Sequence, residues 1–304
     1  MVTIGIPRSL LYYPYGELMS SFYRCLGAEV VTSGETTRET IDRGVKLCVD
    51  EACLPVKCYF GHVESLIEKS DYILVPRFVS VRPHSVVCPK LMGIPDMLKA
   101  VFGERIHPID PLIDTRSGPV WFRKALIHAS RTVTRNPLRI EMAWRTAREG
   151  LMEPLSREDG VGKGDLEVGV IGHSYVTKDS YISMGLLDRL VKMGVRTRTV
   201  DDRVFGYDRR ERRSKIFWSY EQDMFQAVGS MLGKGGVHGV VLVRSFGCGP
   251  GSMVFDLIER ECRRDTLCPV LDISLDEHTG DAGVATRVEA FVDMLRRRES
   301  LREG

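Results

Sequence analysis

The sequence predicts an α/β fold with two Rossmann-like or flavodoxin-like lobes, each built on a parallel sheet, and a helical connector between them. In both halves of the 304-residue chain, short β-rich runs alternate with helical segments, which is typical of a parallel sheet covered on both faces. Residues 120–150 have helical spacing without a strand signal, and the polar stretch at 153–164 contains glycines, as expected at a boundary. We therefore expect an N-terminal lobe at 1–115, a connector at 116–164 and a C-terminal lobe at 165–304.

In the N-terminal lobe, local signals predict where the helices begin and end. Gly27 stops an amphipathic helix, Thr36-Thr37-Arg38-Glu39 resembles a capping box, and Pro55 suits the first position of a helix. Strands are expected where β-rich runs end at proline or glycine. The expected strands are 2–6, 28–32, 72–75, 86–87 and 106–109, and the expected helices are 15–26, 36–47, 55–69 and one through 97–101.

The C-terminal lobe repeats the alternation of strands and helices. Its clearest buried strand is the apolar run at 239–243, which leads directly into the glycine-rich loop around Cys248. The basic run at 209–215 is typical of a solvated face. The expected strands are 167–171, 195–200, 239–243 and 269–273, and the expected helices are 180–193, 218–232, one ending near 263, and 285–298.

Composition and charge exclude several classes of function. Lys and Arg number 43 against 41 Asp and Glu, so nothing calls for nucleic acid or an anionic membrane. No apolar run approaches the roughly 20 residues of a membrane span, and the N-terminus lacks the pattern of a signal peptide. We therefore expect a cytoplasmic protein, in which the eight cysteines are reduced rather than paired in disulfides.

Three of the cysteines share one arrangement, because each is closely followed by a proline at the start of an expected helix. They are Cys53, Cys88 and Cys248. A helix N-terminus carries partial positive charge and unpaired N–H groups, which favour a thiolate. Cys88 and Cys248 also follow β-rich runs, and sites in parallel sheets form at the carboxyl ends of strands. We interpret the three as one converging site; packing is the alternative, since no Cys-x-x-Cys spacing is present.

The other five cysteines give weaker signals. Cys268 precedes a proline but begins a strand, which places it at the opposite edge of the sheet. Cys25 and Cys262 lie near helix ends on expected core faces, where we expect burial. Cys48 and Cys58 each lie five residues from Cys53, a step that does not share a helix face. Both stay open as neighbours of the site or as ligands of a larger cluster.

Several motifs, in order along nearly the whole chain, resemble the 2-hydroxyacyl-CoA dehydratase-related proteins of the DUF2229 group. The most specific is VDEACLPVK at 49–57, followed by YFGHV at 59–63. The other matching pieces are IGIPR at 4–8, VPR at 75–77, CPK at 88–90, SFGCGP at 245–250, DEHTG at 276–280 and TRVEAF at 286–291.

The resemblance implies a 4Fe–4S cluster in a cleft between two such lobes, held by three cysteines with one iron open to a substrate oxygen or small ligand. The positions that match these ligands are Cys53, Cys88 and Cys248. A double-cubane cluster, which uses more cysteines, is less expected. The implied partners are an ATP-dependent iron–sulfur activase, a second homologous subunit and a small-molecule substrate, as in the reductive dehydration of a 2-hydroxyacyl-CoA. The substrate itself is not specified by the sequence.

Polar residues in the loops at the expected site are candidates for contacts with the cluster or the substrate. For Arg8 and Arg77 the alternative role is a salt bridge, and for His173 it is a structural hydrogen bond. The DEHTG run at 276–280 fits either a carboxylate–histidine metal set or, as we expect, a turn that leads into a helix. The candidates are Arg8, Glu51, Arg77, His173 and Tyr175.

Two other classes of function remain open. The chain could be a non-catalytic module that binds a small ligand and signals to the activase. It could also carry zinc or a thiol-redox site on the same cysteines. A two-lobed α/β fold does not discriminate among the three, because fold does not imply function.

Overall fold

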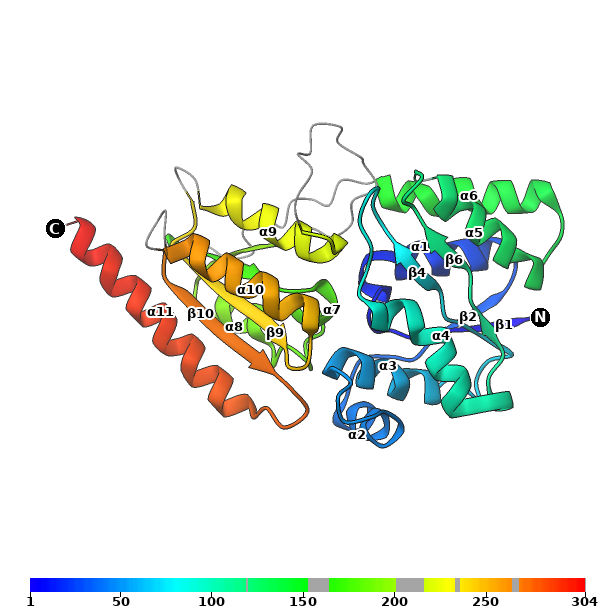
Figure 1. Cartoon of the computed structure of the whole chain (residues 1–304), viewed down its shortest axis with the longest axis horizontal. Coiled ribbons are helices and arrows are strands. Elements are labelled where there is room, and N and C mark those ends of the chain that lie inside the picture. Colours follow the sequence, from blue (N-terminus) through cyan, green and yellow to red (C-terminus); the bar gives the residue numbers. More distant parts are fainter. Residues whose placement is uncertain (119, 153–163, 201–215, 233–235, 264–267, 304) are drawn as a thin grey trace. The chain divides into compact units, whose positions relative to one another are not determined.

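The computed structural model describes the chain except residues 119, 153–163, 201–215, 233–235, 264–267 and 304 (Figure 1). The basic run at 209–215 and most of the expected boundary at 153–164 therefore lie outside the described residues. The chain divides into two compact units, each with its own four-stranded parallel sheet, which confirms the predicted fold class. The first unit comprises the described parts of Met1–Ala52, Val56–Pro154 and Arg203–Tyr220, and the second those of Cys53–Pro55, Leu155–Asp202 and Glu221–Gly304.

The main sheet of the first unit has the strand order β2-β1-β3-β5, and its observed pairs are parallel. A separate two-stranded parallel sheet, β4 with β6, was not expected from the sequence. The prediction of a strand at 86–87 is wrong, because Val86 forms only an isolated β-bridge, with Trp218. The strands are β1 (Thr3–Ile6), β2 (Glu29–Thr32), β3 (Tyr72–Leu74), β4 (Arg77–Ser80), β5 (Pro108–Ile109) and β6 (Leu112–Asp114).

Helices of the first unit differ from expectation mainly at their ends. The first begins at Tyr12 and carries Pro14 in its opening turn, where a missing N–H costs nothing. The second is capped by Thr37, whose side chain exchanges hydrogen bonds with Thr40, one residue later than the expected box. The helices are α1 (Tyr12–Cys25), α2 (Arg38–Leu47), α3 (Leu54–Glu64), α4 (Pro89–Phe102), α5 (Val120–Ala129) and α6 (Pro137–Met152).

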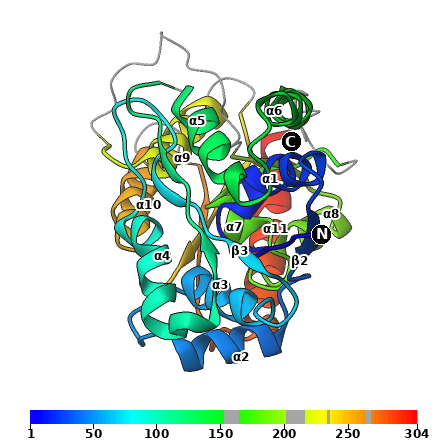
Figure 2. The same ribbon diagram turned by 90° about the vertical axis from the view of Figure 1, so that its right-hand side faces the viewer.

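Two glycines set the position of α3, the helix that follows Cys53. A Cβ added at Gly44 of α2 would lie 1.8 Å from the carbonyl oxygen of Lys57, and one at Gly61 of α3 would lie 1.9 Å from that of Thr40. The backbones of the two helices are thus in direct contact, and α2 lies beside α3 in both views (Figure 1, Figure 2). Only glycine at both positions permits this approach.

The second unit has a parallel sheet with the strand order β10-β9-β7-β8. Strand β9 is almost entirely buried at the centre, as its apolar run predicts. The strands are β7 (Glu167–Ile171), β8 (Arg196–Thr199), β9 (Gly239–Ser245) and β10 (Val270–Leu275), and the helices are α7 (Ser174–Thr177), α8 (Leu186–Lys192), α9 (Ser219–Met231), α10 (Gly249–Glu261) and α11 (Asp281–Glu303).

The helix expected over 180–193 is shorter than predicted. Asp179 Oδ1 accepts hydrogen bonds from the backbone N–H groups of Tyr181 and Ile182, at 3.0 Å each, and holds the chain in a turn. Met184 and Gly185 then adopt left-handed backbone angles, with φ of 53° and 64°, which no helix can include. A regular helix therefore starts only at α8.

Across the described residues, no helix combines the length and the apolar character that a bilayer crossing requires.

Candidate functional site

Each of the three predicted cysteines stands at the start of a helix. Cys88 is the N-cap of α4, with Pro89 as the first helical residue, and Cys248 is the N-cap of α10. Cys53 immediately precedes α3. All three are partly exposed, and no disulfide joins any of the eight cysteines, which all belong to the described residues. Their sulfurs therefore lie where the helix N-terminus favours a thiolate.

The loop that carries Cys248 is shaped by glycines. Gly247 has a left-handed φ of 75°, which turns the chain between β9 and α10. A Cβ at Gly251 would lie only 3.0 Å from Cys248 Sγ and 3.3 Å from the Phe255 ring. Ser252 Oγ donates to the carbonyl of Cys248 at 2.9 Å and closes the first turn. The glycine at 251 thus leaves the space beside the sulfur open.

A hydrogen bond joins the segments that lead to the other two cysteines. Lys90 Nζ, in the first turn of α4, donates to the carbonyl oxygen of Glu51 at 2.9 Å. Glu51 lies two residues before Cys53, and Lys90 lies two residues after Cys88. The side chain of Glu51, a predicted candidate, is exposed, and the residue serves here through its backbone.

Arg77 fixes the body of α4 against β4. Its Nη1 and Nη2 donate to the two carboxylate oxygens of Asp96 at 2.6 and 2.8 Å, and Nη1 also donates to the carbonyl of Met92 at 3.0 Å. Hydrogen bonds from Arg77 lower the pKa of the Asp96 carboxyl. The salt bridge named as the alternative for Arg77 is therefore present, and it orients the helix that begins at Cys88.

Arg8 also makes a salt bridge, with Glu35 at 3.3 Å, and its backbone N–H donates to Ser33 Oγ at 2.8 Å. Ser33 Oγ in turn lies 2.8 Å from Nδ1 of His62, whose Nε2 lies 3.0 Å from Thr36 Oγ1. His62 is 1% exposed and belongs to α3. In the sequence, His62 belongs to a family motif but has no predicted role. In the structure, its side chain links α3 to the loop after β2 through Ser33 and Thr36.

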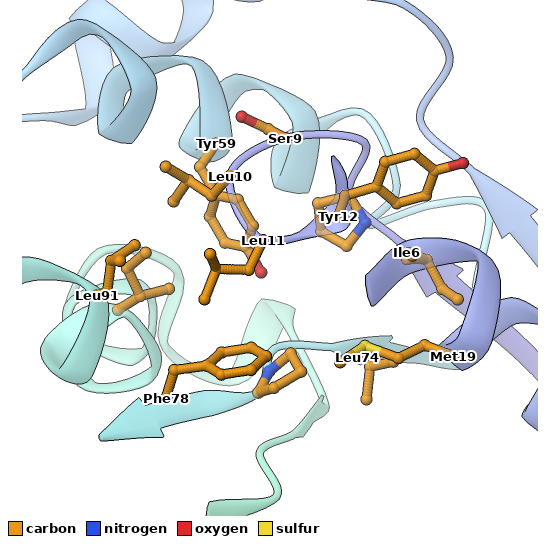
Figure 3. Close-up of a pocket in the computed structure, with 14 residues that line it drawn as sticks. Ile6, Ser9, Leu10, Leu11, Tyr12, Met19, Tyr59, Leu74, Phe78 and Leu91 are labelled. Atoms are coloured by element: carbon orange, nitrogen blue, oxygen red, sulfur yellow. The ribbon is translucent and has the colours of Figure 1, made fainter. Parts of the chain in front are cut away.

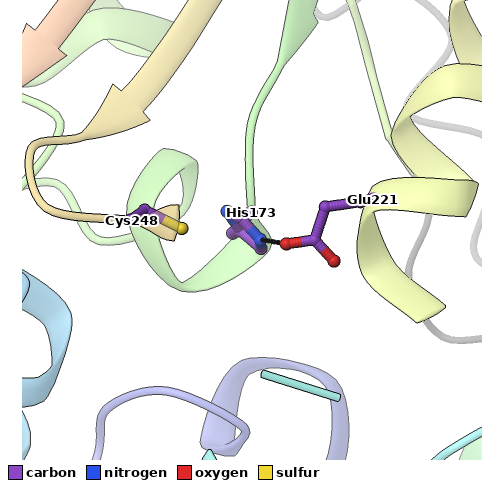
Figure 4. A group of neighbouring side chains, drawn as sticks. All are labelled: His173, Glu221 and Cys248. Carbon is purple, nitrogen blue, oxygen red and sulfur yellow. Dashed lines mark hydrogen bonds and ion pairs between the residues drawn. The ribbon is translucent and has the colours of Figure 1, made fainter. Parts of the chain in front are cut away.

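The second unit brings together a histidine, a glutamate and a cysteine. His173 follows β7 by two residues and Cys248 follows β9 by three, and these strands are parallel neighbours in the sheet. Glu221 comes from the first turn of α9. One ligand atom from each residue lies within 4.8 Å of the others, as Figure 4 shows. The carboxyl edge of the sheet, where ligands bind in such folds, thus carries the group.

His173 and Glu221 form a buried pair. Nε2 of His173 lies 3.1 Å from Oε1 of Glu221, and the two side chains are 4% and 3% exposed. Tyr175, another predicted candidate, stacks on the His173 ring with centroids 4.8 Å apart and an interplanar angle of 20°. The structure therefore places His173 beside Cys248 and in contact with Tyr175, and it adds Glu221, which the sequence did not single out.

The predicted environments of the remaining cysteines are confirmed for Cys262 and Cys268 but not for Cys25. Cys262 is buried, and burial raises the pKa of its thiol to about 12, with a smaller contribution from Cys268. Cys268 lies two residues before β10, at the amino ends of the strands and thus opposite the end that carries Cys248, as expected. The expected burial of Cys25 is wrong: it is exposed at the end of α1, where Phe22 and Leu26 take the core positions. Cys48 is half-buried and Cys58 is buried.

The DEHTG run at 276–280 forms the expected turn into α11. Asp276 Oδ1 accepts from the backbone N–H of His278 at 2.9 Å and from Thr279 Oγ1 at 2.8 Å. The carboxylate of Asp276 is thus used to hold the turn.

The first unit contains a small apolar cavity at the carboxyl ends of β1 and β3 (Figure 3). Its volume is about 30 Å³. Ser9 Oγ, on the loop beside it, is buried and has no hydrogen-bond partner among the described residues. The residues that line the cavity include Ile6, Leu11, Tyr12, Leu74, Phe78 and Leu91.

Two of the solved structures that match the chain have low similarity to it. One is the SBP FpvC from Pseudomonas aeruginosa in complex with Mn²⁺, with 14% identity, a TM-score of 0.28, and coverage of 98% of this chain and 99% of that one. The other is a mutation variant of SsGBP, with 10% identity, a TM-score of 0.29, and coverage of 97% and 98%.

No curated protein matches the chain. A family model described as "2-hydroxyglutaryl-CoA dehydratase, D-component" matches residues 211–295. A second, "CoA enzyme activase uncharacterised domain (DUF2229)", matches residues 3–202, which is well over half of the sequence. The chain therefore belongs to the DUF2229 family, and its C-terminal part is similar to the dehydratase D-component.

Proposed function

We propose that this dehydratase-family component is an iron–sulfur protein that receives a low-potential electron from an ATP-dependent activase and passes it to a small-molecule substrate. Cys53, Cys88 and Cys248 are the proposed ligands of a 4Fe–4S cluster. The observation that carries the proposal is that all three stand at a helix start in a chain that belongs to this family. When bound, such a cluster supplies an electron and an open iron that acts as a Lewis acid.

The residues around the three cysteines fit a bulky group held by thiolates. The absence of a Cβ at Gly251 leaves room beside Cys248 Sγ. The bond from Lys90 to the Glu51 carbonyl ties the turn before Cys53 to the helix that begins at Cys88. Arg77 holds that helix through Asp96. These contacts orient the ligands and limit their motion, which a cluster site requires.

The proposed substrate belongs to the 2-hydroxyacyl-CoA class, and reductive dehydration is the proposed reaction type. His173 and Tyr175 are the proposed substrate contacts, since His173 lies beside Cys248 and Tyr175 stacks on His173. Arg8, Glu51 and Arg77 support the loops instead, through the salt bridges and the backbone contact described above. A second homologous subunit would complete the substrate site.

The test is anaerobic purification and reconstitution of the full chain with iron and sulfide. We expect about four iron and four sulfide per chain with broad visible absorption. Cys53→Ser, Cys88→Ser and Cys248→Ser should each lose most of the iron, because each removes a thiolate ligand. Cys25→Ser is the matched control, since Cys25 is exposed and is the last residue of its helix, α1. Iron near zero in the parent, or equal loss in the Cys25 control, would end the proposal.

A further inference from the structure

The second unit holds a group of three metal-ligating side chains, of which the proposed cluster uses only Cys248. We infer that His173, Glu221 and Cys248 form a site for one divalent transition metal, with Zn²⁺ as the preferred ion, which requires neither Cys53 nor Cys88. The three ligand atoms lie within 4.8 Å of one another (Figure 4). The inference goes beyond the proposed function, because it stands whether or not the chain carries a cluster.

The shape of the group is that of a metal site rather than a proton relay. In a relay, an imidazole lies between the nucleophile and the carboxylate, which are then about 7 Å apart, the sum of two hydrogen bonds and the ring. Here the ligand atoms of Cys248 and Glu221 are no more than 4.8 Å apart, so all three ligand atoms lie close together.

The separations are close to those of zinc coordination. Zinc bonds of about 2.0–2.3 Å in a tetrahedron place neighbouring ligand atoms about 3.3–3.6 Å apart. The His173 and Glu221 atoms are 3.1 Å apart, and the sulfur is within 4.8 Å of both. Metal binding would require the partly exposed Cys248 side chain to turn toward the other two ligand atoms. One coordination position would stay open for water or a ligand.

The charges also fit. A thiolate at Cys248 and a carboxylate at Glu221 each contribute one negative charge, and a divalent ion neutralises the pair. Neutralisation by a metal ion is important here because the side chains of Glu221 and His173 are only 3% and 4% exposed, and a buried charge needs a compensating charge. One imidazole, one carboxylate and one thiolate form a mixed set that suits zinc better than magnesium or calcium.

The structure also holds the ligands in place. His173 precedes α7, and its carbonyl accepts from the N–H groups of Val176 and Thr177 at 2.8 and 3.0 Å. Its ring is stacked on Tyr175. Cys248 is fixed by the first turn of α10 through Ser252. Ligands that are already ordered lose little entropy when the metal binds.

Cys248 belongs to both the inferred metal site and the proposed cluster, so the two occupants exclude each other. Zinc loaded first should therefore slow the assembly of a cluster, and a chelator should restore it.

The experiment is a Co²⁺ titration of the full chain after removal of metals with a chelator under anaerobic conditions. Cobalt reports thiolate ligation by near-ultraviolet charge-transfer absorption and four-coordination by intense visible bands. The Cys53→Ser/Cys88→Ser double variant should keep the spectrum and bind Co²⁺ within about twofold of the parent. His173→Ala, Glu221→Gln and Cys248→Ser should each weaken binding about 100-fold or more.

Matched controls use residues of the same types that are exposed elsewhere. His278→Ala, Glu289→Gln and Cys25→Ser should leave Co²⁺ binding unchanged. The inference is overturned if the double variant loses the cobalt spectrum, or if His173→Ala or Glu221→Gln binds like the parent. Loss of the cluster with retained cobalt binding would instead refute only the proposed function.

Because removal of a buried residue can unfold the unit, thermal stability gives a second readout that needs no buried variant. Zn²⁺ at 100 times its dissociation constant should stabilise the parent by about 2.7 kcal/mol and raise Tm accordingly. The shift should be absent in Cys248→Ser, whose side chain is partly exposed. No zinc-dependent shift in the parent would contradict the inference.

Discussion

His62 shows how a single buried polar residue can position a whole functional segment. Both of its ring nitrogens are within hydrogen-bond distance of hydroxyl groups, Ser33 Oγ at 2.8 Å and Thr36 Oγ1 at 3.0 Å. Ser33 also accepts the backbone N–H of Arg8. The loops after β1 and β2 are thus fixed to α3, the helix that follows Cys53.

We expect His62→Ala to lower the free energy of unfolding of the first unit by about 2–3 kcal/mol, because it leaves buried hydroxyls without their partner and opens a cavity. Urea denaturation monitored by far-ultraviolet circular dichroism measures this. His278→Ala, at an exposed site, should change stability by less than about 0.5 kcal/mol. Equal effects of the two variants would contradict the role given to His62.

Cys262 gives the protein a pH dependence at the alkaline end. Its pKa is raised by burial from 9.0 to about 12, so the unfolded chain loses this proton at lower pH than the folded chain. The stability that the thiol contributes is complete below about pH 9 and declines as pH rises toward 12. Cys262→Ala should therefore show a smaller fall in the free energy of unfolding between pH 8 and pH 10.5 than the parent. An identical slope in both proteins would refute this assignment.

At the scale of elements, the contact between α2 and α3 has no room for any side chain. A Cβ at Gly44 or Gly61 would overlap a backbone carbonyl of the other helix, at 1.8 and 1.9 Å, and backbone atoms cannot rotate away. We expect Gly44→Ala and Gly61→Ala each to destabilise the first unit by about 2–3 kcal/mol.

The matched control is Gly93→Ala in α4, where the nearest atom to an added Cβ is Met97 Sδ at 3.9 Å. Alanine there should stabilise the protein by about 0.5–1 kcal/mol, since glycine is a poor helix former. Thermal denaturation of the three variants compares them directly. If Gly44→Ala were as stable as Gly93→Ala, the close approach of α2 and α3 would be wrong.

The elements differ in how well the sequence predicts them. Strand β9 was predicted because the run at 239–243 is apolar throughout, a pattern that needs no tertiary information. Strands β4 and β6 were missed because they are short, and β4 begins with Arg77, whose charge is paired with Asp96 of α4 and with Asp110 at 4.0 Å. Left-handed Met184 is likewise set by its surroundings, since methionine has no preference for that conformation.

In the candidate site, too, the residues that follow a local pattern were predicted and those that depend on tertiary contacts were missed. Cys88 and Cys248 were found because a cysteine beside a proline at a helix start is a local pattern. Glu221 was missed because its significance comes from the contact with His173, 48 residues away in the sequence. Pairing of that kind depends on the sheet and on α9, and no local pattern encodes it.

On the scale of the whole molecule, the two family matches divide the chain between them, at 3–202 and 211–295. If the proposed function holds, the reduced cluster should appear only when the activase, ATP and a reductant are all present. Electron paramagnetic resonance of the frozen mixture measures this, with ADP in place of ATP as the control. A signal of equal size with ADP would remove the proposed link between ATP hydrolysis and electron delivery.

The neighbouring positions of β7 and β9 have a consequence for the order of folding. His173 and Cys248 are separated by about 75 residues in the sequence, and only the pairing of Val168 with Gly239 and of Ile171 with Leu242 brings their loops together. Contacts at this separation form late, because a long loop must close first. Cobalt absorption during refolding would therefore appear after the helices have formed, and its rate would time the closure of the central sheet.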